Sequence, residues 1–207
     1  MTSLATPRLV RRGQRLAWLT IGWNSVEGIV AIASGAVAGS IALVGFGVDS
    51  FVEVFAGTVI IWRLAQERHG AHISEAAERR AVKLIAGTFF LLSIGIAIES
   101  ARKLIGGEHP ETSVVGIVVT TVSLIVMPLP ARAKRDVGRE MGSRAVQADA
   151  METTLCVWLS AIVLVGLLLN ALFGWWWADP VAALGIVYVA GREGIEHWRS
   201  DAVDDCC

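Results

Sequence analysis

Two pairs of potential metal ligands, each spaced four residues apart, lie inside otherwise apolar stretches of this sequence. Asp49 and Glu53 lie in SIALVGFGVDSFVEVFAG, and Glu152 and Cys156 lie in SRAVQADAMETTLCVWLSA. In a helix, residues i and i+4 occupy one face, one turn apart. Two such faces turned toward each other would supply three carboxylates and one thiolate, enough to surround a divalent cation tetrahedrally.

The composition indicates that these pairs lie in a membrane. The 207 residues are 54% hydrophobic and 18% charged, and the mean hydropathy is +0.59. A carboxylate at membrane depth is costly, so it normally faces a partner, a water-filled cavity or a bound ion. We therefore expect a functional role for these acids. A net charge of −1 gives no indication of a nucleic-acid partner.

Six apolar segments, each approaching the ~20 residues needed to cross the hydrocarbon core, predict an all-α bundle of six transmembrane helices. They cover residues 15–36, 41–65, 81–105, 113–130, 152–173 and 177–194. We place a short segment before them at 1–14, the membrane domain at 15–196, and a Cys-containing tail at 197–207. Polar connectors are expected at 65–80 and 131–144, the fourth helix closing at Pro128 and Pro130. The sequence WWWADP predicts a turn at the membrane interface before the last helix.

The distribution of basic residues predicts the orientation. Of the 18 Lys and Arg residues, 16 fall at the N-terminus, in the two polar connectors with their flanks, or after the last apolar segment. Arg102 and Lys103 alone fall on the opposite side. Since cytoplasmic loops are rich in Lys and Arg, we expect both termini in the cytoplasm and a place in the cell (inner) membrane.

The sequence contains no Walker-type phosphate loop and no dinucleotide fingerprint. We therefore expect no enzyme activity of its own, and any uphill movement of an ion would need an ion gradient.

Several motifs together resemble the cation diffusion facilitator family, six-helix proton-coupled zinc transporters. The family reads roughly Ser-x-Ala-Leu-x-x-Asp-Ser-x-His/Asp-x-x-x-Asp in its second helix, and this chain has SIALVGFGVDSFVE. In the fifth helix the family reads roughly Ser-x-Ala-Leu-x-Ala-Asp-Ala-x-His-x-x-x-Asp, and this chain has SRAVQADAMETTLC. WWWADPVAALGI resembles the family's turn before helix 6. The resemblance covers about residues 15–195 and implies that Asp49, Glu53, Glu152 and Cys156 are the metal ligands.

This chain departs from the family pattern in ways that bear on the metal. Glu152 and Cys156 stand where the family has His and Asp, and Glu53 stands where it has Asp. Oxygen donors favour Mg, Mn or Ca, whereas a thiolate favours Zn, Cd, Cu(I) or thiophilic Fe. The mixture fits Zn²⁺ best among common metals, with Cd, Mn or Fe as alternatives. The family's cytoplasmic C-terminal domain is expected to be missing, making this a member with the transmembrane domain alone.

Other polar residues leave two interpretations open. Asp149 is either an entry ligand or a helix-end residue facing the helix dipole. Asn24 and Glu27 either line the metal cavity or bridge helices, and bridging is favoured. Cys206 and Cys207 with their neighbouring acids either capture a soft metal or are disordered. His69 and His72 are expected to lie in a solvated loop.

These observations predict a divalent metal transporter, most simply a proton-coupled exporter that works by alternating access. The alternative is a membrane protein that binds or senses metal without transporting it. The expected partners are divalent metal ions, protons, the lipid bilayer and a second copy of the chain. The homodimer would form through the small residues of the third helix, because small residues let membrane helices approach closely; these are Gly87, Ser93, Gly95 and Ala97.

Overall fold

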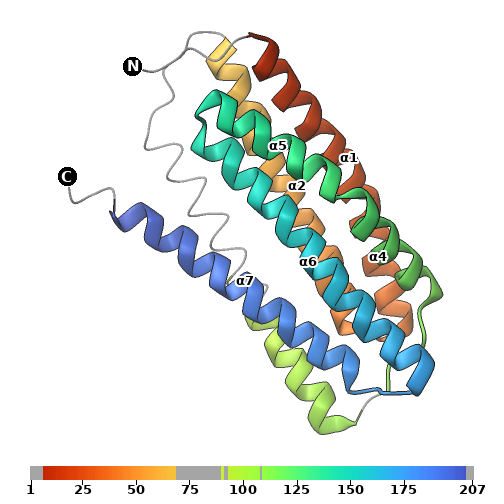
Figure 1. Ribbon diagram of the computed structural model, residues 1–207. Coiled ribbons are helices and arrows are strands. Elements are labelled where there is room, and N and C mark those ends of the chain that lie inside the picture. The colour runs from red at the N-terminus through yellow and green to blue at the C-terminus, as the bar shows by residue number, and fades with distance from the viewer. Residues whose placement is uncertain (1–6, 69–89, 91–92, 108, 204–207) are drawn as a thin grey trace.

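Helices account for the regular structure of the part of the chain that the computed structural model describes, residues 7–68, 90, 93–107 and 109–203 (Figure 1). Helical residues also cover 93–106. The helices with defined bounds are α1 (Pro7–Ala38), α2 (Ile41–Arg68), α4 (Val114–Val126), α5 (Pro128–Met141), α6 (Arg144–Phe173) and α7 (Ala178–Val203). No strand occurs in these ranges, and the predicted all-α fold is confirmed.

Four stretches of the described chain are long and apolar enough to cross a membrane. They are Pro7–Ala38, Ile41–Ala65, Val114–Met141 and Asp149–Phe173. Of the third predicted segment, 81–105, residues 81–89 and 91–92 lie outside the described residues, and residues 93–105 are helical. The last predicted segment, 177–194, corresponds to the first part of α7, which begins at Ala178 and packs on α2 and α6.

The two helices that carry the candidate ligands are neighbours at the centre of the bundle. α2 contacts α1, α6 and α7, while α6 contacts α2, α4, α5 and α7. The main apolar core fills the space between them, with Phe46 from α2, Leu159 and Val163 from α6, and Ile186 from α7 all buried. Toward its C-terminal end α7 diverges from α6 (Figure 1).

The connector predicted after the fourth helix is itself helical, which corrects the sequence-based expectation. Met127 has helical dihedral angles (φ −65°, ψ −25°), and Pro128 occupies the first turn of α5. Proline is tolerated there because the first turn of a helix does not use its N–H groups. Pro128 and Pro130 therefore do not end the helical path, and α5 continues it to Met141. The predicted loop 131–144 is thus largely an amphipathic helix.

A tight turn brings α5 back alongside α6. Gly142 has a left-handed conformation (φ 62°), and the side chain of Ser143 accepts a hydrogen bond from the backbone N–H of Val146 at the start of α6. Near this turn the helices approach closely: a side-chain carbon at Gly138 would lie 3.0 Å from the backbone nitrogen of Gln147. The turn therefore sets which residues of α5 face α6.

The opposite end of the bundle is fixed by Asp179, in the first turn of α7. Its carboxylate accepts hydrogen bonds from the Ser40 hydroxyl and from the backbone N–H of Ile41, the latter at 2.9 Å. Asp179 therefore caps the N-terminus of α2 and ties it to α7. The predicted turn before this helix is confirmed, with Gly174 in a left-handed conformation (φ 64°).

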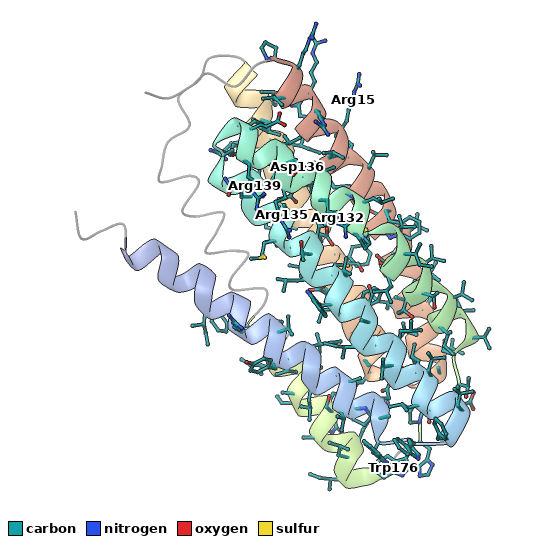
Figure 2. All side chains as sticks on the ribbon, in the orientation of Figure 1. Arg15, Arg132, Arg135, Asp136, Arg139 and Trp176 are labelled. Atoms are coloured by element: carbon teal, nitrogen blue, oxygen red, sulfur yellow. The ribbon has the colours of Figure 1, made fainter. Side chains whose placement is uncertain are left out.

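Basic side chains gather toward the other end of the bundle. Figure 2 shows Arg15, Arg132, Arg135 and Arg139 there, with Trp176 at the far end. This separation agrees with the charge asymmetry on which the predicted orientation rests, although the sidedness in a cell remains a prediction.

Candidate metal centre

Three of the four predicted ligands line one small cavity between α2, α6 and α7. Asp49, Glu53 and Glu152 contribute the acidic side chains, and they are 7%, 5% and 9% exposed. Apolar residues complete the wall: Leu155, Leu159, Val189 and Ala190. The cavity volume of about 10 Å³ is near the lower limit for one water molecule. The space is therefore of the size of a single water or a dehydrated ion.

Cys156, the fourth predicted ligand, lies beside this cavity and not among the residues that line it. Its side chain is 1% exposed and packs in the apolar core with Phe46 and Leu159. Cys156 follows the cavity-lining Glu152 by four residues on α6, so the two side chains lie one turn apart on the same face of that helix.

The three acidic side chains that line the cavity do not form a complete coordination shell. Among the residues that the structure describes, no three His, Cys, Asp or Glu side chains are placed to hold a metal ion together. Oxygen Oε2 of Glu53 and Oε2 of Glu152 are buried without a hydrogen-bond partner. Since a buried unpaired carboxylate oxygen is costly, these two atoms are the ones that a bound cation would satisfy.

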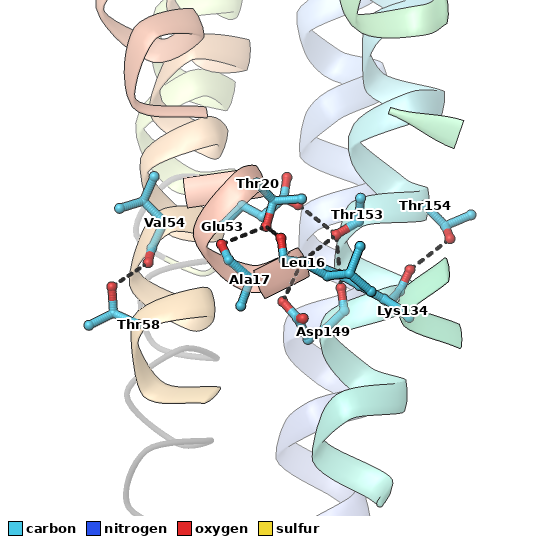
Figure 3. A network of polar contacts seen from close by, with 11 residues as sticks. Leu16, Ala17, Thr20, Glu53, Val54, Thr58, Lys134, Asp149, Thr153 and Thr154 are labelled. Carbon is cyan, nitrogen blue, oxygen red and sulfur yellow. Dashed lines mark hydrogen bonds and ion pairs between the residues drawn. The ribbon is translucent and has the colours of Figure 1, made fainter. Parts of the chain in front are cut away.

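A buried lysine lies next to these acids (Figure 3). The ammonium group of Lys134, from α5, forms an ion pair with Asp149 at 2.9 Å, and both side chains are only 2% exposed. Lys134 also donates a hydrogen bond to the Thr153 hydroxyl at 3.0 Å. Thr153 in turn donates to Oε1 of Glu53 at 2.7 Å. This network fixes one oxygen of Glu53 and leaves Oε2 available.

The network adds a role for Asp149 that the sequence did not indicate. Asp149 is neither at an exposed helix end nor among the residues lining the cavity; it holds the ammonium group that orients Thr153. Sequence reasoning missed Lys134 because it was assigned to a polar loop. The signal was present in the helical spacing of Ala131, Lys134, Val137 and Met141, all buried on one face of α5.

Asn24 and Glu27, expected to bridge helices, are buried on α1 without hydrogen-bond partners for their side-chain atoms. Other predicted sites cannot be placed. His69, His72, Gly87, Cys206 and Cys207 lie outside the residues that the structure describes.

Residues 76–203 match the family described as the cation efflux transmembrane domain. The chain belongs to the cation efflux family. The resemblance drawn from the sequence motifs is thereby confirmed, and with its membrane-crossing helices this member is an integral, multi-pass membrane protein.

Relatives come from several bacteria. The chain is 26% identical over 187 residues to an uncharacterized transporter of Synechocystis sp., covering 87% of this chain and 59% of the relative. It is 31% identical over 176 residues to the cation-efflux pump FieF of Klebsiella pneumoniae, covering 78% and 57%. It is 33% identical over 113 residues to the magnetosome protein MamB of Paramagnetospirillum magneticum, covering 54% and 38%. The chain thus spans less than two thirds of the length of these relatives.

Proposed function

We propose that this protein transports a divalent metal cation across the membrane, with Asp49, Glu53, Glu152 and Cys156 as its ligands. The observation that carries the proposal is the small cavity lined by three buried carboxylates from α2 and α6. Ionisable groups inside a membrane bundle are rare and mark ion pathways. Membership of the cation efflux family supports the same activity.

The donor set favours zinc or a metal of similar softness. Three carboxylates alone would suit Mg²⁺ or Mn²⁺, but a thiolate shifts the preference toward Zn²⁺ and Cd²⁺. Because these side chains bind a metal only when deprotonated, metal binding and proton release are coupled by the chemistry of the ligands. We infer from this coupling that the metal exchanges against protons.

Alternating access would then work by closing and opening the ligand set. Oε2 of Glu53 and Oε2 of Glu152 have no partner in the described structure, so a cation would draw α2 and α6 together around it. Protonation of the same groups would remove the attraction and release the metal. The basic end of the bundle, where Arg132 and Arg139 lie (Figure 2), would face the cytoplasm by the positive-inside rule.

Flux into proteoliposomes tests this function. Purified protein would be reconstituted with a Zn²⁺-sensitive dye inside the vesicles, with and without an imposed pH gradient. We expect Zn²⁺ entry that depends on the gradient, and its loss in Glu152→Ala. A matched control is Glu140→Ala, an exposed acid on α5, which should transport normally.

Two results would contradict the proposal in different ways. Zn²⁺ binding with proton release but without flux would indicate a metal-binding or sensing protein. Unchanged calorimetric Zn²⁺ affinity in both Asp49→Ala and Glu152→Ala would show that the cavity is not the binding site at all.

A further inference from the structure

A second group of buried polar atoms without hydrogen-bond partners lies between α1 and α4, apart from the residues that line the metal cavity. Asn24 is fully buried and Glu27 is 3% exposed. Both side-chain polar atoms of Asn24, both carboxylate oxygens of Glu27, and the hydroxyl oxygen of Ser123 are buried without a hydrogen bond. Asn24 and Glu27 are three residues apart, so they share one face of α1.

Glu27 lies on α1 where that helix packs on α4, but its carboxylate has no hydrogen-bond partner there. The Ser123 hydroxyl on α4 and the Trp23 indole face its carboxylate, but neither forms a hydrogen bond of ordinary geometry with it. A helix-bridging acid would satisfy its oxygens in the bridge. An unpaired buried carboxylate instead costs several kcal/mol, and a bound cation would remove that cost.

The charges around Glu27 indicate the valence of the ion. The Glu27 carboxylate interacts electrostatically with the carboxylate of Glu53 and with that of Asp49. Oε2 of Glu53 is itself without a partner. Two carboxylates neutralise a divalent cation, and the amide and hydroxyl oxygens of Asn24 and Ser123 would complete an all-oxygen donor set. Such donors suit Mn²⁺ or Mg²⁺ better than a thiophilic metal.

We propose that Glu27, Asn24 and Ser123 form a second cation position next to the cavity of Asp49, Glu53 and Glu152, sharing the Glu53 carboxylate with it. Its role as a step on the path of the ion rests on the proposed transport function. Its capacity to bind a cation does not depend on transport, so cation binding at this position and the transport function can be refuted separately.

Mn²⁺ binding to the purified protein in detergent tests the proposal. Equilibrium dialysis would count bound Mn²⁺ per chain, and the electron paramagnetic resonance of free Mn²⁺ would give affinities. We expect two equivalents for the unmodified protein and one for Asp49→Asn/Glu152→Gln. We expect Glu27→Gln to weaken one equivalent by about 10-fold or more, and the triple variant to bind none.

Two further variants separate ligation from structure. Ser123→Ala removes a donor without introducing a polar group, so it should weaken the second equivalent while leaving the first unchanged, even if Glu27→Gln folds poorly. Glu99→Gln makes the same chemical change at an acid that is paired with Arg102 and whose side chain is 43% exposed, so it should bind like the unmodified protein.

The proposal is overturned if Glu27→Gln and Ser123→Ala both titrate like the unmodified protein, or if Asp49→Asn/Glu152→Gln binds no Mn²⁺. Two bound equivalents in a protein that gives no flux would leave this second position standing and refute only the proposed transport.

Discussion

The buried ion pair between Lys134 and Asp149 gives the sharpest test of how this bundle is held together. Lys134→Met keeps an apolar stem of similar length but leaves the Asp149 carboxylate without the partner that lies 2.9 Å away. Removing one member of a buried pair typically costs about 3–5 kcal/mol, because the remaining charge stays buried. The lost hydrogen bond to Thr153 contributes about 1 kcal/mol within that range.

Removing both charges should cost far less than removing one. In Lys134→Met/Asp149→Leu neither member of the pair is left buried without its partner, and replacement of a buried pair by apolar residues is often neutral or stabilising. Asp149→Leu alone should cost roughly as much as Lys134→Met, because it leaves the ammonium group unpaired. We therefore expect the double variant to lie within about 1–2 kcal/mol of the unmodified protein.

The free energy of unfolding can be measured in mixed micelles with a rising fraction of sodium dodecyl sulfate, using the fluorescence of the eight Trp residues. Arg132→Met is the matched control, since Arg132 is exposed on the same helix and its loss should cost no more than about 0.5 kcal/mol. A cost below about 1 kcal/mol for Lys134→Met, or a double variant whose cost equals the sum of the two single costs, would refute the reasoning.

Three other expected outcomes follow from the same structure. Cys156→Asp should lower the affinity for Cd²⁺ relative to Mn²⁺, because loss of a thiolate costs the softer ion most; an unchanged ratio in competition titrations would show that Cys156 is not a ligand. Asp179→Ala should lower the free energy of unfolding by about 1–3 kcal/mol, because the Ser40 hydroxyl and the Ile41 backbone N–H lose their acceptor. An unfolding midpoint equal to that of the unmodified protein, in the same micelle titration, would show that these hydrogen bonds do not stabilise the bundle. Gly95→Leu should shift a homodimer toward monomer in light scattering without disturbing the protomer, because nothing lies within 4 Å of a side-chain carbon at that position; an unmodified protein that is monomeric even in added lipid would exclude the dimer.

Local features of the sequence were enough to predict the class of fold and where the ligand-bearing helices lie. Long apolar segments indicate membrane-crossing helices, because the hydrocarbon core sets a minimum length for a helix that crosses it. The four-residue spacing of Asp49 and Glu53 places both on one face of any helix that contains them. For this reason, the acids lining the cavity could be named without coordinates.

The contacts between helices could not be read in the same way. Pro128 and Pro130 indicated a helix end by their usual effect, but Pro128 falls where α5 needs no N–H donor, and the helical path continues. That continuation carries Lys134 into the bundle, and the turn at Gly142 sets it against Asp149 on α6.

The sequence by itself determined which residues are costly to bury, because charge and hydropathy are properties of single residues and short windows. Only the tertiary structure decided which of them have partners. It paired Asp149 with Lys134, bonded Thr153 to Glu53, placed Cys156 beside the cavity, and left Glu27 without a hydrogen bond. The physical reason is that satisfaction of a buried charge depends on atoms a few ångströms away in space, which belong to helices far apart in the chain.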